Sequence, residues 1–379
     1  MGNRKSTLES VGLMNLKRIF SETFKKRTVL ITGHTGFKGA WLTLWLESLG
    51  ANVIGYSLDP PTEPSFFHET GLSDRITDIR GDISDQEHIF KVIEEYKPGF
   101  IFHLAAQPLV RSSYKNPVDT FRINIMGTAT VLEAIRISER PSVCICITSD
   151  KCYENREWDY AYRENDPMGG HDPYSASKGA AELVIAAYRR SFFSRNNQGP
   201  TCSVASARAG NIIGGGDWAE DRLVPDCVRA LATGEKIRIR NPTAVRPWQF
   251  VLDPLSGYLW LAAKMKEDPR LYADAWNFGP CYANNVNVKT LTELLIHQWG
   301  SGEWEDVSQP DDHSVHEAEY LKLDIAKAMT KLGWKPVYNL KNTLQKTVDW
   351  YKNYYHKKTD PDDFSLGQID TYMQDANKK

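Results

Sequence analysis

The sequence predicts an α/β protein with a doubly wound parallel sheet and a smaller, mixed α/β region that binds a substrate. Three observations predict this fold class. Strand and helix patterns alternate over the first 180 residues, a glycine-spaced loop lies between the first strand and the helix that follows it, and the pattern becomes irregular and richer in Gly, Trp and Pro after Arg208. Alternating strands and helices are typical of parallel sheets with right-handed crossovers.

The expected elements follow from short apolar runs and helical periodicity. Runs such as TVLIT, SVCICIT and CSVASAR are rich in small and β-branched residues, as in buried strands, and they are separated by longer segments with a helical apolar pattern. We expect strands at 28–32, 51–58, 79–83, 100–106, 142–148 and 202–208, and helices at 38–49, 86–96, 117–138 and 174–192.

These elements divide the chain into regions. Residues 27–210, with 244–275, are expected to form the nucleotide-binding domain, and residues 211–243 and 276–358 the substrate-binding region. Residues 1–26 are basic and weakly amphipathic, have no continuous apolar stretch of a signal peptide, and read as an N-terminal extension. Residues 359–379 are expected to be a polar, peripheral tail.

Composition excludes several classes of protein. Of 379 residues, 41% are hydrophobic and 25% are charged, which is ordinary for a soluble globular chain, and no apolar run approaches the roughly 20 residues of a membrane span. A net charge of −2 gives no basic field for nucleic acid or an anionic membrane. The six cysteines lack metal-ligand spacing, so we expect free thiols, no metal site and a cytoplasmic location.

The loop Gly33–Gly39 carries glycines at 33, 36 and 39. Glycine allows a tight turn and a close approach to a pyrophosphate, while the following helix directs its N-terminal N–H groups at the charge. The position of this loop between a strand and a helix predicts dinucleotide binding. The residues expected to contact the cofactor here are Gly33, Thr35, Gly36, Phe37, Lys38 and Gly39.

The identity of the dinucleotide depends on the end of the second strand. Asp59 lies about twenty residues beyond Gly39, where a carboxylate accepts the ribose hydroxyls of NAD, although Ser57 is an alternative for this position. No arginine follows in 56–65, which argues against NADP. Asp82 is expected at the adenine, with a helix-capping role as its alternative. Further cofactor contacts are expected from Ile83, Leu104, Ala105, Ala106 and Gln107.

A second motif points to redox chemistry on an alcohol. Tyr174 and Lys178 are four residues apart at the start of a helix, so their side chains share one face. An ammonium beside a phenol lowers the pKa of the phenol, and the phenolate then acts as a base. Ser149, at the end of the fifth strand, is placed to bond the same substrate hydroxyl. Together with a nicotinamide, these three residues are expected to oxidise a secondary alcohol, and Tyr174 and Lys178 also to contact the cofactor.

Six segments carry a resemblance to the extended short-chain dehydrogenase/reductase family, and within it to the 4,6-dehydratases of nucleotide sugars. They are GHTGFKGAWL (33–42), HLAAQPLVR (103–111), TSDKCYEN (148–155), DPYSASKG (172–179), RAGNIIGGGDWAEDRLVPD (208–226) and RPWQFVLDPLSGY (246–258). The resemblance runs from about residue 27 to residue 355 and implies a Rossmann-type domain and a hydro-lyase.

The resemblance also implies the roles of Asp150 and Lys151. Asp150 fits the general acid that protonates the departing C6 hydroxyl. Lys151 replaces the glutamate that serves as the C5 base in dTDP-glucose dehydratases. A lysine accepts that proton only when it is neutral, which requires a depressed pKa; otherwise it stabilises the enolate electrostatically. The identity of the C5 base therefore stays open.

Finally, the resemblance implies a substrate, an assembly and a pathway. The substrate is CDP-glucose, and the cytosine base rests on the resemblance alone. Homodimers or homotetramers would form through helices 117–138 and 174–192, and the pathway would be deoxysugar synthesis for a surface polysaccharide such as an O-antigen. Alternatives are a nucleotide-sugar 4-epimerase, a dehydratase for another nucleotide sugar, and an NAD-binding scaffold without catalysis. Residues expected to hold the substrate are Gln107, Arg111, Asn211, Arg222, Arg240 and Arg246, whereas His313 and His316 are expected to be ordinary loop residues.

Overall fold

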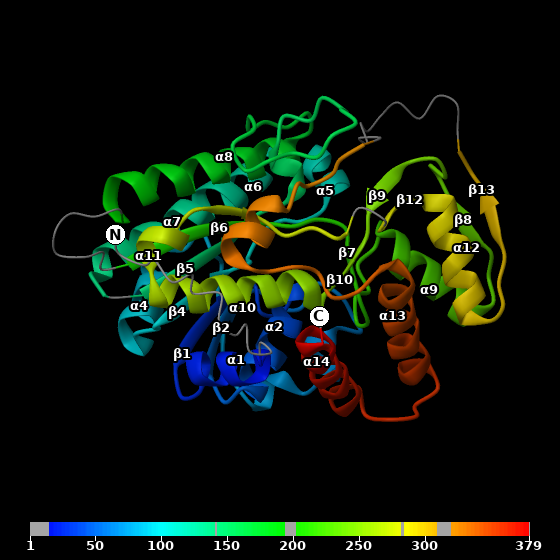
Figure 1. Ribbon diagram of the computed structural model, residues 1–379, viewed down its shortest axis with the longest axis horizontal. Helices are drawn as coiled ribbons and strands as arrows, with labels where there is room; N and C mark the ends of the chain where they lie inside the picture. Colours follow the sequence, from blue (N-terminus) through cyan, green and yellow to red (C-terminus); the bar gives the residue numbers. More distant parts are fainter. Residues whose placement is uncertain (1–14, 141, 194–201, 282–283, 309–319, 379) are drawn as a thin grey trace, which may run out of the picture.

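The computed structural model describes residues 15–140, 142–193, 202–281, 284–308 and 320–378. Its centre is a seven-stranded sheet in the order β11-β6-β5-β4-β1-β2-β3, and all of its pairings are parallel. Figure 1 shows this sheet between two layers of helices. The strands are β1 Thr28–Thr32, β2 Asn52–Ser57, β3 Thr77–Arg80, β4 Phe100–His103, β5 Ser142–Ile147, β6 Cys202–Arg208 and β11 Ala275–Asn277.

The predicted doubly wound parallel sheet is confirmed, with two strands displaced from their expected bounds. The third strand was expected at 79–83 but spans 77–80, because Thr77–Arg80 pairs with Ile54–Ser57 and the chain turns away after Gly81. The fourth strand was expected at 100–106 but ends at His103. Residues after His103 leave the sheet at its carboxyl edge, where parallel sheets bind ligands.

One helical layer covers the sheet on the side of α4, α7 and α8, with a core that includes Leu30, Ile101 and Val204. The predicted helix 117–138 is one helical stretch with a π-helical turn, Arg122–Met126, in its middle. The predicted helix 174–192 likewise ends in a π-helical turn, Arg189–Phe193. The helices of this layer are α4 Gln86–Tyr96, α5 Val110–Lys115, α6 Pro117–Phe121, α7 Gly127–Ser138 and α8 Pro173–Tyr188.

The other layer is formed by segments far apart in the sequence. Helices α1 and α14, from the two ends of the chain, pack against each other, α1 also contacts α10, and α14 also contacts α2 (Figure 1). Phe20 and Tyr372 are fully buried in this layer. The helices are α1 Leu16–Phe24, α2 Phe37–Ser48, α3 Phe66–Glu69, α10 Leu252–Glu267, α11 Pro269–Tyr272 and α14 Pro361–Asn377.

The expectation of a peripheral tail at 359–379 is therefore wrong. Helix α14 buries Ile369, Tyr372 and Met373, and the Tyr372 hydroxyl donates to the Asp253 carboxylate at 2.9 Å. Residues 359–379 are mostly polar, and their few apolar residues do not show a helical period by themselves. The buried face of α14 therefore becomes evident only from the helices that pack against it. Within the N-terminal extension, 16–24 is a packed helix, whereas residues 1–14 lie outside the described part of the chain.

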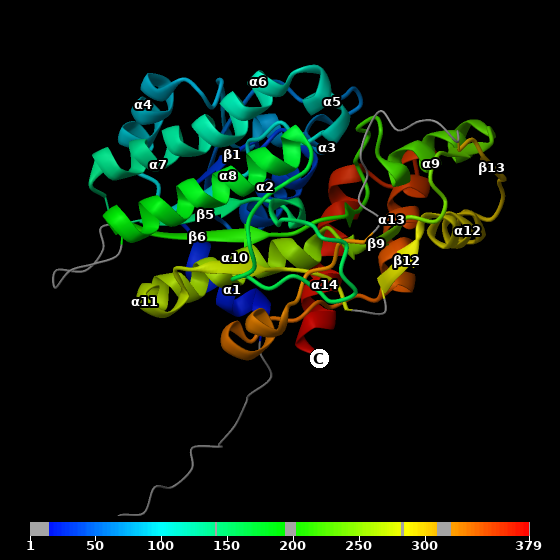
Figure 2. The ribbon, with the colours of Figure 1, turned by 90° about the horizontal axis from the view of Figure 1, so that it is seen from above.

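The smaller region projects from the carboxyl edge of the sheet (Figure 2). Two boundaries differ from those expected. The edge strand β11 belongs to the main sheet although 276–358 was placed in the substrate region, and β9 pairs with β12 in the smaller region although 244–275 was placed with the sheet. The elements here are β7 Ile212–Ile213, α9 Leu223–Thr233, β8 Ile237–Ile239, β9 Val245–Pro247, β10 Gln249–Phe250, β12 Asn285–Asn287, α12 Val288–Trp299, β13 Trp304–Asp306 and α13 Leu340–Tyr355.

The cysteines, possible metal ligands and possible membrane-spanning helices were considered over all described residues. All six cysteines are free, and five of them are buried, as expected. In the described ranges, no three His, Cys, Asp or Glu side chains are grouped to hold a metal ion. None of the helices found in those ranges has the length and apolar character needed to cross a membrane. His313 and His316 lie in 309–319, outside the described residues.

Candidate active site

The glycine loop is shaped by backbone contacts that exclude side chains. Gly33 has φ +77°, and a Cβ there would lie 2.7 Å from the backbone nitrogen of Ala105. A Cβ on Gly39 would lie 2.0 Å from the Gly33 carbonyl oxygen. Helix α2 begins directly after Gly36 without a side-chain cap, so its first N–H groups are available to an anion. The loop therefore fits the pyrophosphate of a dinucleotide.

The end of β2 differs from the expectation in one respect. Thr35 and Ser57 share a hydrogen bond of 2.9 Å, whereas the Asp59 side chain is 90% exposed and lies 3.6 Å from Arg80. Arg80 lies opposite Ser57 on the neighbouring strand β3, and its guanidinium donates a hydrogen bond to the Leu58 carbonyl. Residues 56–65 contain no arginine, but the neighbouring strand β3 supplies this guanidinium, which the sequence alone did not predict. Its charge is met by Asp78 at 2.8 Å as well as by Asp59.

The other residues expected at the cofactor have defined partners. Asp82 accepts bonds from the backbone and hydroxyl of Ser84 and lies 3.4 Å from Arg122, so its carboxylate supports the turn before α4. Ile83 packs under Gly127. The Gln107 side chain donates to Thr120 and to the Leu109 carbonyl, so it holds its own loop together. Leu104, Ala105 and Ala106 follow β4 at the carboxyl edge.

Helix α8 and the segment after strand β5 bring the expected catalytic residues together. Asp172 is the N-cap of helix α8: its carboxylate accepts the N–H of Ser175, and Pro173 is the first residue of the helix. Tyr174 and Lys178 then lie on successive turns of one face. Ser149 and Asp150 follow β5, and the Ser149 hydroxyl donates to Asp150 Oδ1 at 2.9 Å. Ser149 acts on Tyr174 by lowering the pKa of its phenol, and the side chains of Ser149, Asp150, Tyr174 and Lys178 are all buried.

Asn211 lies beside these residues rather than among the arginines. It was expected to bind the substrate's diphosphate, but its amide donates to Asp150 Oδ2 at 3.0 Å. It adopts a left-handed backbone conformation, φ +50°, and a Cβ on the preceding Gly210 would lie 2.0 Å from the Asp150 carboxyl carbon. The segment after β6 thus holds the Asp150 carboxylate from the opposite side.

The electrostatics of this cluster correct one expectation. Burial raises the pKa of Tyr174 to about 12, against the lowering effects of Ser149 and Arg222, so the protein's own groups do not depress the pKa of this phenol as expected. Burial lowers the pKa of Lys178 to about 8, which weakens the positive charge that was expected to act on the phenol. Burial, Lys178 and Arg222 also lower the pKa of Lys38 to about 7, opposed by Asp150.

A cleft of about 1810 Å³ opens between the sheet edge and the smaller region. Ser149, Asp150, Lys151 and Tyr174 lie on its wall together with Lys38. The arginines expected at the substrate line the same cleft, whereas Gln107 does not appear in its wall. These arginines are Arg111, Arg222, Arg240 and Arg246.

Two carboxylates accompany these arginines. Arg222 pairs with Asp217 at 2.8 Å, and Asp221 lies 3.0 Å from Arg240 and 3.9 Å from Arg111. Asp221 has φ +60°, in the left-handed region. The cleft therefore presents a cluster of guanidinium groups suited to phosphates, with acidic residues that fix or balance them.

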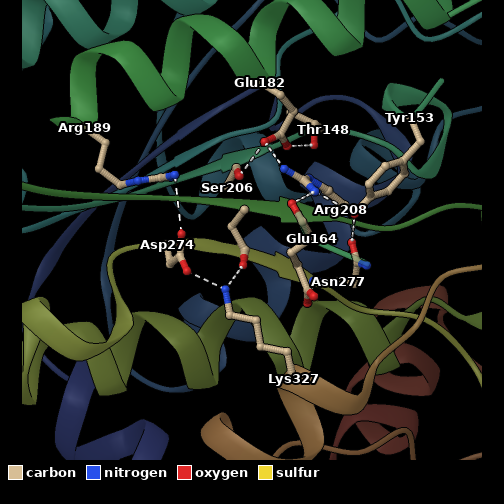
Figure 3. Close-up of polar contacts among 11 residues, drawn as sticks. Thr148, Tyr153, Glu164, Glu182, Arg189, Ser206, Arg208, Asp274, Asn277 and Lys327 are labelled. Atoms are coloured by element: carbon tan, nitrogen blue, oxygen red, sulfur yellow. Dashed lines mark hydrogen bonds and ion pairs between the residues drawn. The ribbon is translucent and has the colours of Figure 1, made fainter. Parts of the chain in front are cut away.

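Residues next to the catalytic ones in the chain form a buried polar network that the sequence did not reveal (Figure 3). Glu182, one turn after Lys178, accepts bonds from Thr148 at 2.6 Å and Ser206 at 2.8 Å and pairs with Arg208 at 2.7 Å. Arg208 also donates to Tyr153 at 2.6 Å. Burial alone would raise the pKa of Glu182, but Arg208 and the hydroxyls outweigh it and lower that pKa. The network fixes the chain on both sides of Ser149, Asp150 and Lys151.

A parallel sheet with a glycine loop at its first crossover, and a serine, tyrosine and lysine at its carboxyl edge, defines a protein of the short-chain dehydrogenase/reductase type. Comparison of the sequence with protein families makes the assignment narrower. Residues 30–347 match the family described as GDP-mannose 4,6 dehydratase, and the chain belongs to that family.

Individual relatives of known activity support this family assignment. The chain is 48% identical over 328 residues to the CDP-glucose 4,6-dehydratase of Salmonella typhimurium, covering 86% of this chain and 90% of that protein. It is 25% identical over 343 residues to a dTDP-glucose 4,6-dehydratase of Xanthomonas campestris pv. campestris, covering 86% of this chain and 93% of that protein.

Solved structures share the fold at lower sequence identity. The dTDP-glucose 4,6-dehydratase of Bacillus anthracis, solved in complex with NAD, aligns with a TM-score of 0.71 at 22% identity, covering 86% of this chain and 97% of that one. The UDP-glucose 4-epimerase of Thermotoga maritima aligns with a TM-score of 0.72 at 21% identity, covering 86% and 99% of the two chains.

Proposed function

We propose that this protein is an NAD-dependent hydro-lyase that converts CDP-glucose to CDP-4-keto-6-deoxyglucose. The observation that carries the proposal is the meeting of two groups at one cleft. Ser149, Asp150 and Tyr174 lie on its wall, so that an alcohol-oxidising group, to which Lys178 one turn further along α8 belongs, stands beside a separate acid, Asp150. A 4-epimerase needs no acid to expel a hydroxyl. The 48% identity to a CDP-glucose 4,6-dehydratase favours this reaction and this nucleotide.

NAD fits the glycine loop, whose backbone leaves room for a pyrophosphate at the N-terminus of α2. When bound, it supplies the hydride acceptor for C4 and the hydride donor for C6. Ser57 and Thr35 face the ribose end, while Asp59 reaches the ribose only if its exposed side chain turns toward the loop. Relatives solved with NAD support the cofactor. Asp82, Ile83 and residues 104–107 are also proposed to contact NAD.

The protein's own residues perform the remaining chemistry. Tyr174 receives the proton of the C4 hydroxyl, Lys178 supports it electrostatically, and Asp150 protonates the C6 hydroxyl so that it leaves as water. The C4 ketone acidifies C5–H, and a lysine amine accepts this proton and later returns it. Lys151 and Lys38 both line this part of the cleft, and the pKa of Lys38, near 7, leaves part of its amine neutral at neutral pH.

The substrate's diphosphate binds among the arginines of the cleft. Arg222 and Arg246 are its main partners. Arg111 and Arg240, which lie beside Asp221, would give up their ion pairs with this carboxylate and bind phosphate oxygens instead. Asn211 contributes through its bond to Asp150. In this arrangement the sugar lies toward Tyr174 and the nucleotide toward α9 and β8.

Incubation of the purified protein and NAD with CDP-glucose, dTDP-glucose, UDP-glucose and GDP-mannose tests the proposal. We expect the mass of one water to be lost from CDP-glucose alone. A product of unchanged mass with an altered sugar would identify an epimerase. Dehydration of another nucleotide sugar in preference to CDP-glucose would contradict the assignment of the base. No product from any of the four would favour a scaffold.

We also propose a homo-oligomer that assembles through α6, α7 and α8. Val118 is 78% exposed and Leu183 62% exposed, which is unusual for large apolar side chains. Five more exposed apolar side chains lie on the helical stretches of this layer: Tyr114, Phe121, Met126, Ile137 and Phe192. This surface supports a dimer, with a tetramer as a further step, and the enzyme would work in the cytoplasm in deoxysugar synthesis for a surface polysaccharide such as an O-antigen.

The double substitution Val118→Glu and Leu183→Glu is expected to convert the assembly to monomers, because opposed carboxylates would be buried without partners. Light scattering after size-exclusion chromatography measures this change. Leu271→Glu is the matched control, since Leu271 is 58% exposed on α11, outside this set of helices. An unchanged mass for the double variant would contradict this interface.

A further inference from the structure

We propose that Glu182 is a positioning residue for the oxidation of C4. Its carboxylate holds residues 149–151 against the helix α8, which carries Tyr174 and Lys178. The inference rests on the proposed function, and it gives Glu182 a role in the rate of the reaction in addition to its role in stability. Glu182 itself touches neither the substrate nor the cofactor in this account.

The Glu182 carboxylate joins three elements of the main sheet and its helical layer. It projects from α8, one turn beyond Lys178, and accepts the hydroxyl of Thr148, directly after β5, at 2.6 Å. From β6, Ser206 donates to its other oxygen at 2.8 Å and Arg208 donates to the same oxygen at 2.7 Å (Figure 3). Because both oxygens are bonded and the side chain is 4% exposed, the carboxylate is fixed in one orientation.

The contact with Thr148 lies immediately before the catalytic segment. The backbone N–H of Thr148 donates to the Ala207 carbonyl of β6 at 3.0 Å, so β6 holds the backbone of this residue while α8 holds its side chain. The next two residues in the chain are Ser149 and Asp150. A displacement of Thr148 relative to α8 would therefore move both of them relative to Tyr174.

A second contact with α8 lies immediately after the catalytic segment. A Cβ on Gly179 would lie 2.7 Å from the Gly169 carbonyl oxygen and 3.0 Å from that of Cys152, so the absence of a side chain lets the helix approach this backbone closely. The N–H of Gly169 also donates to the Cys152 carbonyl at 2.9 Å. Helix α8 thus contacts the chain on both sides of residues 149–151, through Thr148 before them and Cys152 after them.

This arrangement bears on the rate because the oxidising group comes from two separate elements. In the proposed reaction the C4 hydroxyl lies within reach of Ser149 and gives its proton to Tyr174, while the hydride passes to NAD. A misplacement of about 1 Å between reacting groups lowers a rate by about 100-fold. The glycine loop and the arginines of the cleft lie on other segments. Loss of the Glu182 contact should therefore lower kcat and leave the KM for CDP-glucose and the affinity for NAD close to those of the unaltered protein.

The test compares Thr148→Val, Thr148→Ser and the unaltered protein in single turnovers with NAD and CDP-glucose, stopped at short times and analysed by mass. In Thr148→Val, which loses the hydroxyl and keeps a branched side chain, we expect a rate constant about 10-fold lower. Thr148→Ser, which keeps the hydroxyl, should restore the rate constant. Thr347→Val is the matched control, because Thr347 is fully buried in α13 and its hydroxyl donates to the Thr343 carbonyl at 2.8 Å. This control should keep the rate constant.

The amplitude of the turnover separates positioning from stability. Unfolded molecules lower the amplitude but leave the rate constant of the folded molecules unchanged. Glu182→Gln should therefore lower both, with a rate constant about 10- to 100-fold below that of the unaltered protein. CDP-glucose carrying deuterium at C4 identifies the step that slows. The isotope effect on the rate constant of Thr148→Val should be at least as large as in the unaltered protein.

Amide hydrogen exchange, followed by mass spectrometry, gives a reading that needs no substrate. The N–H of Lys151 donates to the Ser149 hydroxyl oxygen at 3.2 Å, and the N–H of Cys152 donates to the Ser149 carbonyl at 3.3 Å. Both should exchange faster in Thr148→Val than in the unaltered protein, and Thr347→Val should leave them unchanged.

Four outcomes in Thr148→Val would overturn the positioning role: an unchanged rate constant, a loss of amplitude alone, a smaller isotope effect, or unchanged exchange at these two amides. An equal loss of rate in Thr347→Val would also contradict it. If the unaltered protein dehydrates no nucleotide sugar, the proposed function fails, and with it the role of Glu182 in C4 oxidation. The exchange experiment then still decides whether Glu182 holds residues 149–151, so the two failures are distinguishable.

Discussion

Replacement of Tyr174 by phenylalanine is expected to lower kcat by about 10²–10⁴-fold while NAD binding is kept. The change removes one hydroxyl from a buried position where the ring still fits, so the first turn of α8 and its Asp172 cap are preserved. Without the phenol oxygen, the C4 hydroxyl has no group to receive its proton. Steady-state kinetics with CDP-glucose, together with NAD binding followed by fluorescence, measure both effects.

Tyr160→Phe is the control for this experiment. Tyr160 is 66% exposed in the loop after β5, and the loss of its hydroxyl should leave kcat unchanged. Full activity in Tyr174→Phe would remove this residue from the chemistry. Loss of NAD binding in the same variant would instead assign Tyr174 to the cofactor alone.

Glu182→Gln is expected to lower the free energy of unfolding by about 3–5 kcal/mol. Both partners of the Glu182–Arg208 ion pair are 4% exposed, so the neutral amide would leave a buried guanidinium without its counter-charge. The hydroxyls of Thr148 and Ser206 would each lose a charged acceptor. Urea denaturation followed by circular dichroism measures the change, provided that the slope with denaturant stays constant.

The matched control is Glu133→Gln on α7. Glu133 forms an ion pair with Arg136 at 2.6 Å, but both side chains are at least a quarter exposed, and solvent screens such a pair so that its contribution to stability is small. Equal effects of the two substitutions would contradict the importance of burial. Because the pKa of Glu182 is lowered on folding, its contribution is present above the unfolded value near 4.5 and is lost as pH falls through the folded pKa. The difference between unaltered protein and Glu182→Gln should therefore shrink in acid.

Much of the fold followed from local signals. Strand β6 and helix α4 begin and end at the predicted residues, because an apolar run and a helical period are each complete within a few residues. Helix α14 was not predicted because its apolar residues are few and become a buried face only where α14 packs against α1, α2 and α13. A helix that is buried by such long-range packing need not have a clear helical period of apolar residues in its sequence.

The candidate site shows the same division between local and long-range information. Tyr174 and Lys178 share a helix face by spacing alone, and the serine follows a strand, so their meeting could be predicted. The bond from Asn211 to Asp150 and the place of Arg80 beside Ser57 depend on the order of strands, which spacing does not encode. The raised pKa of Tyr174 likewise depends on burial, which the spacing of Tyr174 and Lys178 does not encode.

In the proposed reaction, one protein oxidises C4 of a nucleotide sugar and returns the same hydride to C6. Conversion of CDP-glucose carrying deuterium at C4, with the product examined by mass spectrometry and proton NMR, tests it most directly. We predict a product that has lost one water and carries deuterium in its C6 methyl group. Deuterium retained at C4, or lost to solvent while water is eliminated, would contradict the account.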